Sequence, residues 1–252
     1  MILVSTVHDP LGIFNSLVRD KLPELNSLFR SVVASVTTST DKKLIKTLKD
    51  RLGWTIIPGA GYSEAKVAAL KKALSLDEDK FFFCDLDKIL HWLEVAPRQL
   101  SKIEKIPLKV NYLILGRDRK TFATYPDSWI KTEEITNFLL SKELGVKVDA
   151  LAATCLINRE GAKVIVEKAN GKNWESPIEW PLLIKKNGLR LGYREAKGLT
   201  WEDPDRSKAE IKRFGGITKW EEEKFDSLEE WSKRISAMYF QVKILKEIVD
   251  SK

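Results

Sequence analysis

Two aspartates that follow an apolar run are the residues best suited to chemistry in this chain. Residues 81–87 read Phe-Phe-Phe-Cys-Asp-Leu-Asp, so Asp85 and Asp87 stand at a spacing of two after the pattern of a buried strand. In open α/β sheets, ligands bind at the carboxyl ends of the strands. Two carboxylates there can hold a divalent cation, which in turn can hold a diphosphate. The alternative interpretation is a turn in which Asp87 caps the following helix.

Polar residues also follow the first two predicted strands. The first strand ends at His8 and Asp9, which could contact a nucleotide, or Asp9-Pro10 could simply form a turn. The second ends at Ser39-Thr40-Asp41, which is expected to cap the next helix and could also hydrogen-bond a nucleoside. Because the strands are expected to be parallel, these residues and the two aspartates would meet at one edge of the sheet.

A glycine-containing turn follows the third predicted strand. Gly59 and Gly61 permit close approach of the backbone to a ligand, and Lys66 in the first turn of the next helix could reach a diphosphate. The segment matches neither a P-loop nor a dinucleotide-binding fingerprint, because the required Gly-Lys-[Ser/Thr] ending and glycine spacing are missing. One helical turn after Asp87, His91 could be a metal ligand or a phosphate contact; a packing histidine is the alternative.

Two acidic residues later in the chain could activate or orient an acceptor. Glu179 lies near the start of a predicted helix, where it could act as a general base or merely benefit from the helix dipole. Asp149, at the start of its predicted strand, could play the same part. The carboxylate-rich segment 199–206 contains Trp201 and is interpreted as either an acceptor-site loop or a solvated turn.

Hydrophobic patterning predicts the elements that must position these residues. Strands and helices alternate along the first half, which indicates a mainly parallel sheet with helices on both faces. The predicted strands are 2–7, 31–37, 54–57, 80–84, 111–116, 148–157, 189–194 and 198–202. The predicted helices are 12–29, 41–52, 63–75, 88–104 with a break at Pro97, 132–143 capped by Thr132, 159–169, 177–187 and 221–250.

The last predicted helix carries an apolar stripe at three- and four-residue steps. The stripe consists of Phe225, Leu228, Trp231, Ile235, Met238, Val242, Leu245 and Val249. We expect this C-terminal helical extension to pack on the main domain; a helix that faces a partner or a membrane is the alternative. The expected organisation is one domain over residues 1–215 and a C-terminal helix over residues 216–252.

Composition narrows the class of protein. The chain has 252 residues and a formal net charge of +7, which suits anionic ligands. Its lysines are scattered, without the basic and aromatic stripe of nucleic-acid-binding modules, so no nucleic-acid partner is expected. The two cysteines, Cys84 and Cys155, lie in apolar runs and are predicted to be buried thiols in a reducing compartment. Without a membrane-length apolar stretch or a signal peptide, a soluble cytoplasmic protein is expected, and peripheral membrane contact stays open.

The order of these motifs resembles the GT-A nucleotide-sugar transferases, especially the family-2 glycosyltransferases. In that family a Ser-Thr-Asp element follows the second strand, a glycine-containing turn opens an alanine-rich helix, and a metal-binding Asp-x-Asp follows. The matching segments here are Ser39-Thr40-Asp41, Gly59 through Leu74, and Asp85-Leu86-Asp87. A later acidic helix start followed by a glycine turn into a strand resembles residues 179–193. The family's usual Pro-x-[Tyr/Phe]-Asn-Glu entry is replaced by residues 8–12.

This resemblance implies a GT-A-like, Rossmann-like open sheet and an enzyme that moves a sugar from a nucleotide-diphosphate donor to an acceptor. Asp85 and Asp87 would hold Mg²⁺ or Mn²⁺ on the donor, and Glu179 would take the place of the acceptor-activating acid. The basic surface would suit an acceptor that is anionic or lipid-linked. The alternatives are a binding or regulatory module that kept the fold without the chemistry, and a sugar nucleotidyltransferase.

Overall fold

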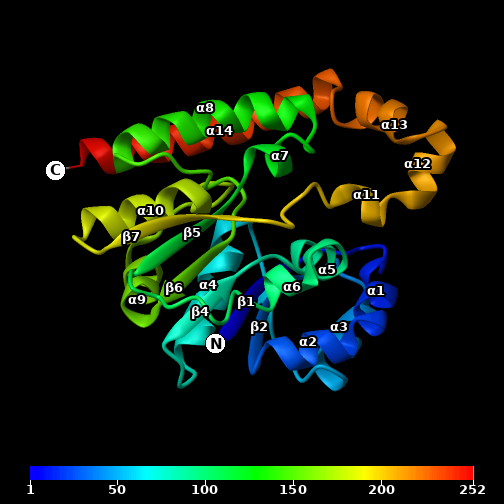
Figure 1. The fold of residues 1–252 in the computed structure, drawn as a ribbon, viewed down its shortest axis with the longest axis horizontal. Helices are drawn as coiled ribbons and strands as arrows, with labels where there is room; N and C mark the ends of the chain where they lie inside the picture. The colour runs from blue at the N-terminus through cyan, green and yellow to red at the C-terminus, as the bar shows by residue number, and fades with distance from the viewer. Residues whose placement is uncertain (252) are drawn as a thin grey trace.

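The computed structural model describes residues 1–251, and in this range seven strands form one mixed sheet (Figure 1). The strands are β1 (Ile2–Val7), β2 (Ser31–Thr37), β3 (Thr55–Gly59), β4 (Lys80–Phe83), β5 (Tyr112–Arg117), β6 (Cys155–Asn158) and β7 (Leu191–Ala196). Their order is β3-β2-β1-β4-β6-β5-β7. Only β6 is antiparallel to its neighbours, β4 and β5. The prediction of an open, mainly parallel sheet is therefore confirmed.

Helices cover both faces of this sheet. They are α1 (Phe14–Asp20), α2 (Leu22–Leu28), α3 (Lys42–Asp50), α4 (Ser63–Leu74), α5 (Leu86–Val95), α6 (Pro97–Leu100), α7 (Arg119–Phe122), α8 (Asp127–Leu144), α9 (Arg159–Lys168), α10 (Ser176–Lys186), α11 (Asp203–Arg206), α12 (Lys208–Phe214), α13 (Ile217–Lys224) and α14 (Leu228–Asp250). In Figure 1 the long helices α8 and α14 lie side by side, and α11 to α13 form an arch that leads from β7 to α14.

The alternation of side chains along each strand divides the core into two layers. Leu3 and Phe82 point to one face, where α1, α2, α3 and α5 bury them. Ile2, Val4 and Phe83 point to the other face, against α4, α9 and α10, with α8 and α14 at one side. Because both faces are covered, the central strands are continuously apolar. That is why β1 and β4 could be recognised from the sequence.

A third, smaller cluster of aromatic side chains fixes the arch. Trp201 and Trp220 stack with ring centroids 5.4 Å apart, and Phe225 meets both rings edge-on at 4.8 and 4.9 Å. Tyr125, on the loop before α8, belongs to the same cluster and donates a hydrogen bond to the carbonyl of Leu199. The segment that leads to α11 is thereby held against the main body of the protein.

Several predicted elements are wrong. Residues 198–202 form no strand, and only the last part of the predicted strand 148–157 pairs, as β6. In the unpaired part, the amide of Ala150 donates to the side chain of Asn137 on α8, so this backbone is engaged outside the sheet. Thr132 is not a cap, because α8 begins at Asp127 and the Thr132 hydroxyl donates to the Ser128 carbonyl within the helix.

Two of the predicted helices also differ in detail from those in the structure. Residues 12–29 form two helices, α1 and α2, and the predicted helix 221–250 is interrupted before α14, whose N-terminus is capped by Ser227. Helix α14 packs against α8 and α10, but three of the eight residues of the expected apolar stripe are exposed: Leu228 at 90%, Ile235 at 49% and Val249 at 44%. Gln241 and Ile244 are buried instead, since the true contact face is rotated from the stripe. The division of the chain at residue 215 stays a prediction.

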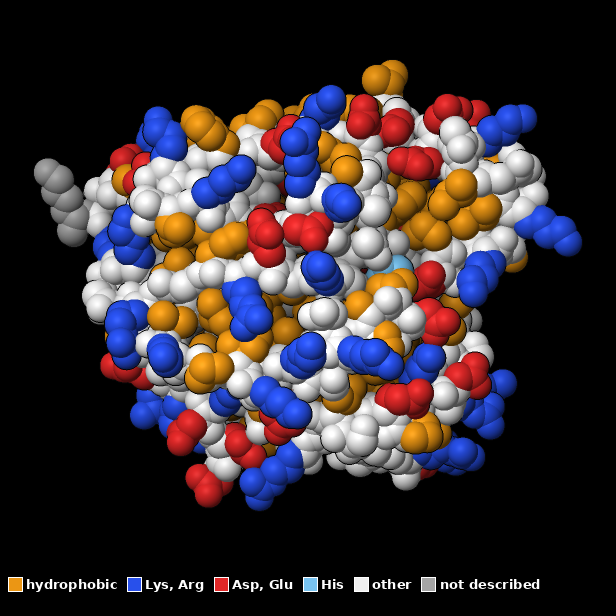
Figure 2. All heavy atoms as spheres, viewed as in Figure 1, with side chains coloured by type: hydrophobic (Ala, Val, Ile, Leu, Met, Phe, Trp, Pro, Cys, Tyr) orange, Lys and Arg blue, Asp and Glu red, His pale blue; other side chains and the backbone are white. Residues whose placement is uncertain are grey.

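Other sequence-based expectations concern the cysteines, the membrane and the surface. Cys84 and Cys155 are buried free thiols, as predicted. In the described part of the chain, no helix is both long and apolar enough to cross a membrane. Figure 2 shows basic and acidic side chains interspersed over one face of the molecule, so the positive charge is not gathered into a single patch there.

A substitution at Gly198 tests how the arch is attached. Gly198 has φ +97°, and a Cβ there would lie 2.5 Å from the indole of Trp92 on α5. Gly198→Ala should therefore lower the free energy of unfolding by about 2–4 kcal/mol, from backbone strain and overpacking together. Gly145→Ala is the control, because Gly145 also has a positive φ but nothing within 4 Å. It should cost about 1 kcal/mol. Urea denaturation measures both variants. Equal losses of unfolding free energy in the two would contradict the close contact between residue 198 and Trp92.

Candidate functional site

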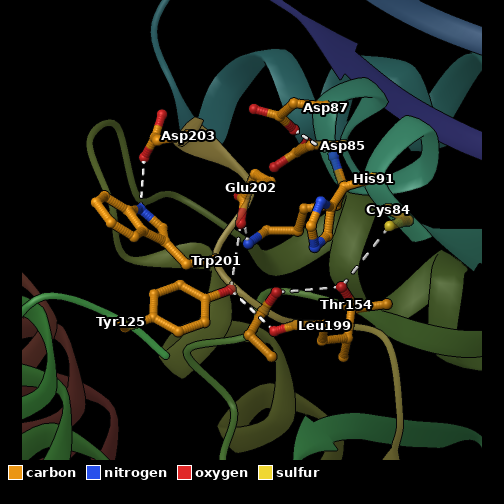
Figure 3. A network of polar contacts seen from close by, with 12 residues as sticks. Cys84, Asp85, Asp87, His91, Tyr125, Thr154, Leu199, Trp201, Glu202 and Asp203 are labelled. Atoms are coloured by element: carbon orange, nitrogen blue, oxygen red, sulfur yellow. Dashed lines mark hydrogen bonds and ion pairs between the residues drawn. The ribbon is translucent and has the colours of Figure 1, made fainter. Parts of the chain in front are cut away.

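A cavity of about 280 Å³ opens at the carboxyl ends of the adjacent strands β1 and β4. Its walls come from these strand ends, from α5, α8, α11 and α14, and from the loop before α10. The lining includes both aspartates of the sequence motif, Asp85 and Asp87. Figure 3 shows them beside Glu202, with Tyr125 and Trp201 on the far side of Glu202. The strand-end placement predicted from the sequence brings the two carboxylates into a cavity.

Asp85 is held by two donors at the end of β4. Its carboxylate accepts a hydrogen bond from the Thr6 hydroxyl on β1, and its other oxygen lies 3.4 Å from Nζ of Lys66. Lys66 is only 1% exposed and lies beneath the ring of Tyr62, 4.4 Å from its centroid. Burial by itself lowers the pKa of Lys66, but Asp85 and Tyr62 raise it to about 12, so the amine stays charged. A positive charge is therefore fixed next to Asp85.

Asp87 lies in the first turn of α5 and faces the arch. One oxygen accepts from the amide of Lys88, and the other lies 3.6 Å from the guanidinium of Arg206. Burial, followed by the negative charges of Glu202 and Asp85, raises the pKa of Asp87 to about 7. The N-cap residue of α5 is Asp85, and it makes no side-chain capping bond. The interpretation of Asp87 as the cap of this helix is therefore wrong, and capping does not occupy these carboxylates.

The polar lining also includes four residues that the sequence did not indicate as members of one site: Thr6, Lys88, Glu202 and Arg206. Lys88 pairs with Glu202 at 2.9 Å, and Glu202 also accepts from the Tyr125 hydroxyl at 3.3 Å. Arg206 pairs with Asp203, whose second oxygen accepts from the Trp201 indole at 3.0 Å. Glu202 and Asp203 are buried, so the alternative of a solvated turn for segment 199–206 is wrong. In the sequence, the carboxylates next to Trp201 were the signal that could have identified this part of the lining.

The two carboxylates fit a hard divalent cation, although they cannot surround one. Carboxylate oxygens are the ligands that Mg²⁺ prefers, and Mg²⁺ is usually bound by one or two carboxylates together with phosphate oxygens and water. Within residues 1–251, no three His, Cys, Asp or Glu side chains gather as a complete ligand set. Asp85 and Asp87 would thus supply part of the coordination shell, and a diphosphate and water would supply the remainder.

His91 has a different place from the one expected. Its Nδ1 lies 2.6 Å from the Asp205 carboxylate and its Nε2 lies 2.6 Å from the Thr200 hydroxyl. Both ring nitrogens are thereby engaged, and His91 does not line the cavity. Its position on the buried face of α5 lets it tie the arch to this helix. The structure gives it a packing role and not a metal-binding one.

The residues expected to contact a nucleotide divide into two groups. Asp9 is buried and accepts from the amides of Ile13 and Phe14 at 3.0 and 2.7 Å, which forms the turn into α1. Asp41 caps α3 by accepting from the amides of residues 43 and 44, as predicted. Their carboxylates are engaged by backbone groups. Asp9 nevertheless borders a second hollow of about 790 Å³ next to the first cavity.

His8 and Ser39 remain exposed at the same edge. Both meet the hydroxyl of Thr37, His8 through Nδ1 at 2.9 Å and Ser39 through Oγ at 3.3 Å. His8 lines both the first cavity and the second hollow. The glycines serve the backbone: a Cβ at Gly59 would lie 2.6 Å from Ser35 Oγ, and Gly61 has φ +70°. Neither glycine lines either cavity.

The two candidate general bases lie outside the cavity. Asp149 accepts from the amide and guanidinium of Arg117 and from the Asn137 amide group. Although burial raises its pKa, Arg117 and these hydrogen bonds hold it below its usual range, which makes Asp149 a weak base. It borders a separate groove with Phe138 and Tyr193.

Glu179 anchors a loop. Its Oε1 accepts from the amides of Asn170 and Gly171 at 2.7 and 3.0 Å, and burial raises its pKa. Glu179 borders another hollow with Lys186 and is absent from the cavity of the two aspartates. The expected acceptor-activating position of Glu179 is therefore not found, because this side chain turns toward the backbone of residues 170–171.

Comparison with known proteins supports the fold. No protein-family model matches the chain, and no curated protein sequence matches it. Among solved structures, glucosyl-3-phosphoglycerate synthase from Mycobacterium tuberculosis, in complex with Mn²⁺, UDP and phosphoglyceric acid, is similar at 13% identity and a TM-score of 0.50. That match covers 77% of this chain and 67% of the other.

The same enzyme in complex with Mn²⁺, UDP-glucose and glycerol 3-phosphate matches 86% of this chain and 80% of the other, again at 13% identity and a TM-score of 0.50. These neighbours are GT-A proteins, so the GT-A-like fold that the sequence motifs implied is confirmed. At this identity the likeness concerns the fold.

The pKa of Asp87 gives a test of the site's electrostatics. Folded Asp87 keeps its proton up to about pH 7, whereas in the unfolded chain it ionises near pH 4. The unfolded state then binds fewer protons, so this group makes the free energy of unfolding fall as pH rises between these values. Asp87→Asn should remove that fall and gain about 2–4 kcal/mol at pH 8 relative to pH 4. Urea denaturation at several pH values measures the free energy of unfolding of both proteins. If the two free energies change with pH in the same way, the raised pKa of Asp87 is contradicted.

The loop-anchoring role of Glu179 predicts a local effect. Glu179→Ala removes the acceptor of two amides, so hydrogen exchange at Asn170 and Gly171 should accelerate by about tenfold. Glu179→Gln keeps an acceptor oxygen and should exchange nearly as slowly as the wild type. Exchange measured by mass spectrometry or NMR checks both variants. Equal exchange in all three proteins would show that Glu179 does not hold the loop.

Proposed function

We propose that this protein transfers a sugar from a nucleotide-diphosphate donor to an acceptor, with the help of a divalent cation. The observation that carries the proposal is the pair Asp85 and Asp87 at the carboxyl end of β4, facing a cavity in a GT-A-like fold. Two fixed cations, Lys66 and Arg206, lie beside these carboxylates. Carboxylates for a metal and cations for phosphates are what a diphosphate donor requires.

The donor diphosphate would bind at the two aspartates. Mg²⁺ or Mn²⁺ on Asp85 and Asp87 would supply charge neutralisation for the leaving diphosphate. Thr6 and Lys66 keep the Asp85 carboxylate in one orientation before any ligand arrives. Such preorganisation lowers the cost of reordering the site during reaction. Arg206 pairs with Asp203 and lies 3.6 Å from Asp87, so its charge stands where a phosphate on these aspartates would bind.

The nucleoside would extend toward the second hollow. His8 and Arg206 line both spaces, so a ligand with its diphosphate at Asp85 would have its nucleoside next to the hollow beside α1. His8 and Ser39 present polar side chains at that edge. The similar structures contain UDP or UDP-glucose with Mn²⁺, which supports UDP-sugars as the first donors to test.

In the transfer itself, an acceptor hydroxyl oxygen bonds to the anomeric carbon of the sugar. The bond from that carbon to the diphosphate breaks, the nucleoside diphosphate leaves with the bonding electrons, and the hydroxyl proton is released. Lys66 is charged at neutral pH and can stabilise the negative charge that develops on the leaving group. Glu179 and Asp149 do not reach the cavity, so neither is assigned as the general base.

Nucleotide binding tests this proposal directly. Calorimetric titration of UDP should show tighter binding in the presence of Mn²⁺, because the cation bridges the diphosphate and the aspartates. Asp87→Ala should weaken the metal-dependent binding by about tenfold or more. Asp79→Ala is the matched control. Asp79 is an exposed carboxylate that directly precedes β4, at the end of the strand opposite Asp85. It should bind UDP as the wild type does.

Two results would count against the proposal. Equal UDP affinity with and without metal in a folded sample would show that the protein has no metal-dependent donor site. Release of pyrophosphate in place of a nucleoside diphosphate, on incubation with a sugar phosphate and a nucleoside triphosphate, would indicate nucleotidyl transfer. The reaction products can be separated by ion-exchange chromatography.

A further inference from the structure

Two partly exposed aromatic rings stand at the mouth of the cavity. Tyr62 is 39% exposed and Trp174 is 40% exposed, and their ring centroids are 6.4 Å apart. Both residues line the cavity that contains Asp85. Trp174 is also 6.5 Å from the ring of Phe240 on α14. Large aromatic surfaces that stay open to solvent beside a cavity indicate contact with a ligand.

The loop that carries Trp174 is firmly held, so its exposure is not the result of a loose loop. Gln241 on α14 donates to the Trp174 carbonyl at 3.1 Å, and the Ser63 hydroxyl donates to the Asn173 carbonyl at 2.7 Å. At the start of the loop, Glu179 accepts from two amides. Contacts from α4, α10 and α14 therefore present the indole at a fixed place.

The ion pairs in the cavity bear on the class of acceptor. Every lysine and arginine that lines it within residues 1–251 already faces a carboxylate. These pairs are Lys88 with Glu202, Arg206 with Asp203 and Asp87, and Arg234 with Glu230. The deeper Lys66 pairs with Asp85. A donor diphosphate would engage Arg206, and Arg234 stays paired with Glu230, so no unpaired cation of the lining remains for a phosphorylated or carboxylated acceptor.

We infer that the acceptor is an uncharged carbohydrate, with one sugar ring stacked on Trp174 and Tyr62. The apolar C–H face of a pyranose ring complements an aromatic face, while its hydroxyl groups need hydrogen-bonding partners. Thr132, Glu133 and Gln241 line the same cavity, and each keeps an oxygen that can accept a hydrogen bond from a sugar hydroxyl. This inference rests on the proposed function and narrows it, because it names the acceptor of the same site.

The place of the aromatic pair also agrees with the arrangement that sugar transfer requires. Trp174 of the aromatic pair meets Phe240 on α14, whereas the hollow assigned to the nucleoside is lined by residues at the start of α1. A sugar attached to the diphosphate at Asp85 would thus lie between the nucleoside and the acceptor. An acceptor hydroxyl is then positioned to bond the anomeric carbon as the nucleoside diphosphate leaves.

A glycan array tests the inference with neutral, sialylated and phosphorylated glycans on one surface. The labelled full-length protein is applied with UDP and Mg²⁺, which fill the donor side without turnover. We expect binding to neutral glycans, weakened about tenfold in Trp174→Ala and also reduced in Tyr62→Ala. Phe138→Ala is the control, because Phe138 is 62% exposed on α8 and does not line this cavity. It should bind as the wild type does.

The outcomes separate this inference from the proposed function. UDP affinity is measured by calorimetry on the wild type and on every variant. A wild-type protein that does not bind UDP would contradict the proposed function itself. Intact UDP binding with preference for phosphorylated or sialylated glycans would overturn the neutral acceptor. So would the absence of any bound neutral glycan, or binding that is unchanged in both Trp174→Ala and Tyr62→Ala. Thermal unfolding confirms that each variant is folded.

Discussion

The buried ion pair between Lys66 and Asp85 is the interaction on which the rest of the site depends. A lysine that is 1% exposed remains acceptable only if a carboxylate faces it, because an unpaired buried charge is strongly destabilising. The pair joins the first turn of α4 to the end of β4, and the Thr6 hydroxyl adds a third element, β1. Three elements that are far apart in the sequence thereby converge at one strand edge. The same pairing leaves a permanent positive charge beside the carboxylates, where a diphosphate would need it.

Around this pair, opposite charges face one another across the cavity, and residues 202–206 supply three of them: Glu202, Asp203 and Arg206. Glu202 and Arg206 reach the site only because the aromatic cluster of Trp201, Trp220 and Phe225 packs the arch against the loop before α8. His91 adds hydrogen bonds from α5 to the same segment. The mutual neutralisation of these groups makes a polar cavity compatible with burial. It also leaves little excess charge, which is the physical reason for inferring an uncharged acceptor.

The two sides of the cavity have different origins. The side proposed for the donor consists of strand ends and the turns that follow them, where a GT-A-like sheet brings its strand termini together. The side proposed for the acceptor consists of α8, α14 and the loop before α10, which carry aromatic and amide side chains. Variation of loops and added helices on a constant sheet can change specificity without moving the residues at the strand ends, such as Asp85 and Asp87. The low identity to the similar structures is compatible with such a division.

The sequence by itself determined the strands of the first half, the mainly parallel sheet, and the position of Asp85 and Asp87 at a strand end. These features follow from local patterns: apolar runs for buried strands, period 3.6 for helices, and polar residues where a strand stops. Only the tertiary structure decided what each acidic residue does. Glu179 turned to the backbone of a loop, and Asp149 turned to Arg117. Glu202 came from more than a hundred residues away to meet Lys88. Contacts between distant segments depend on how helices pack over the sheet, and no local pattern in the chain records that packing.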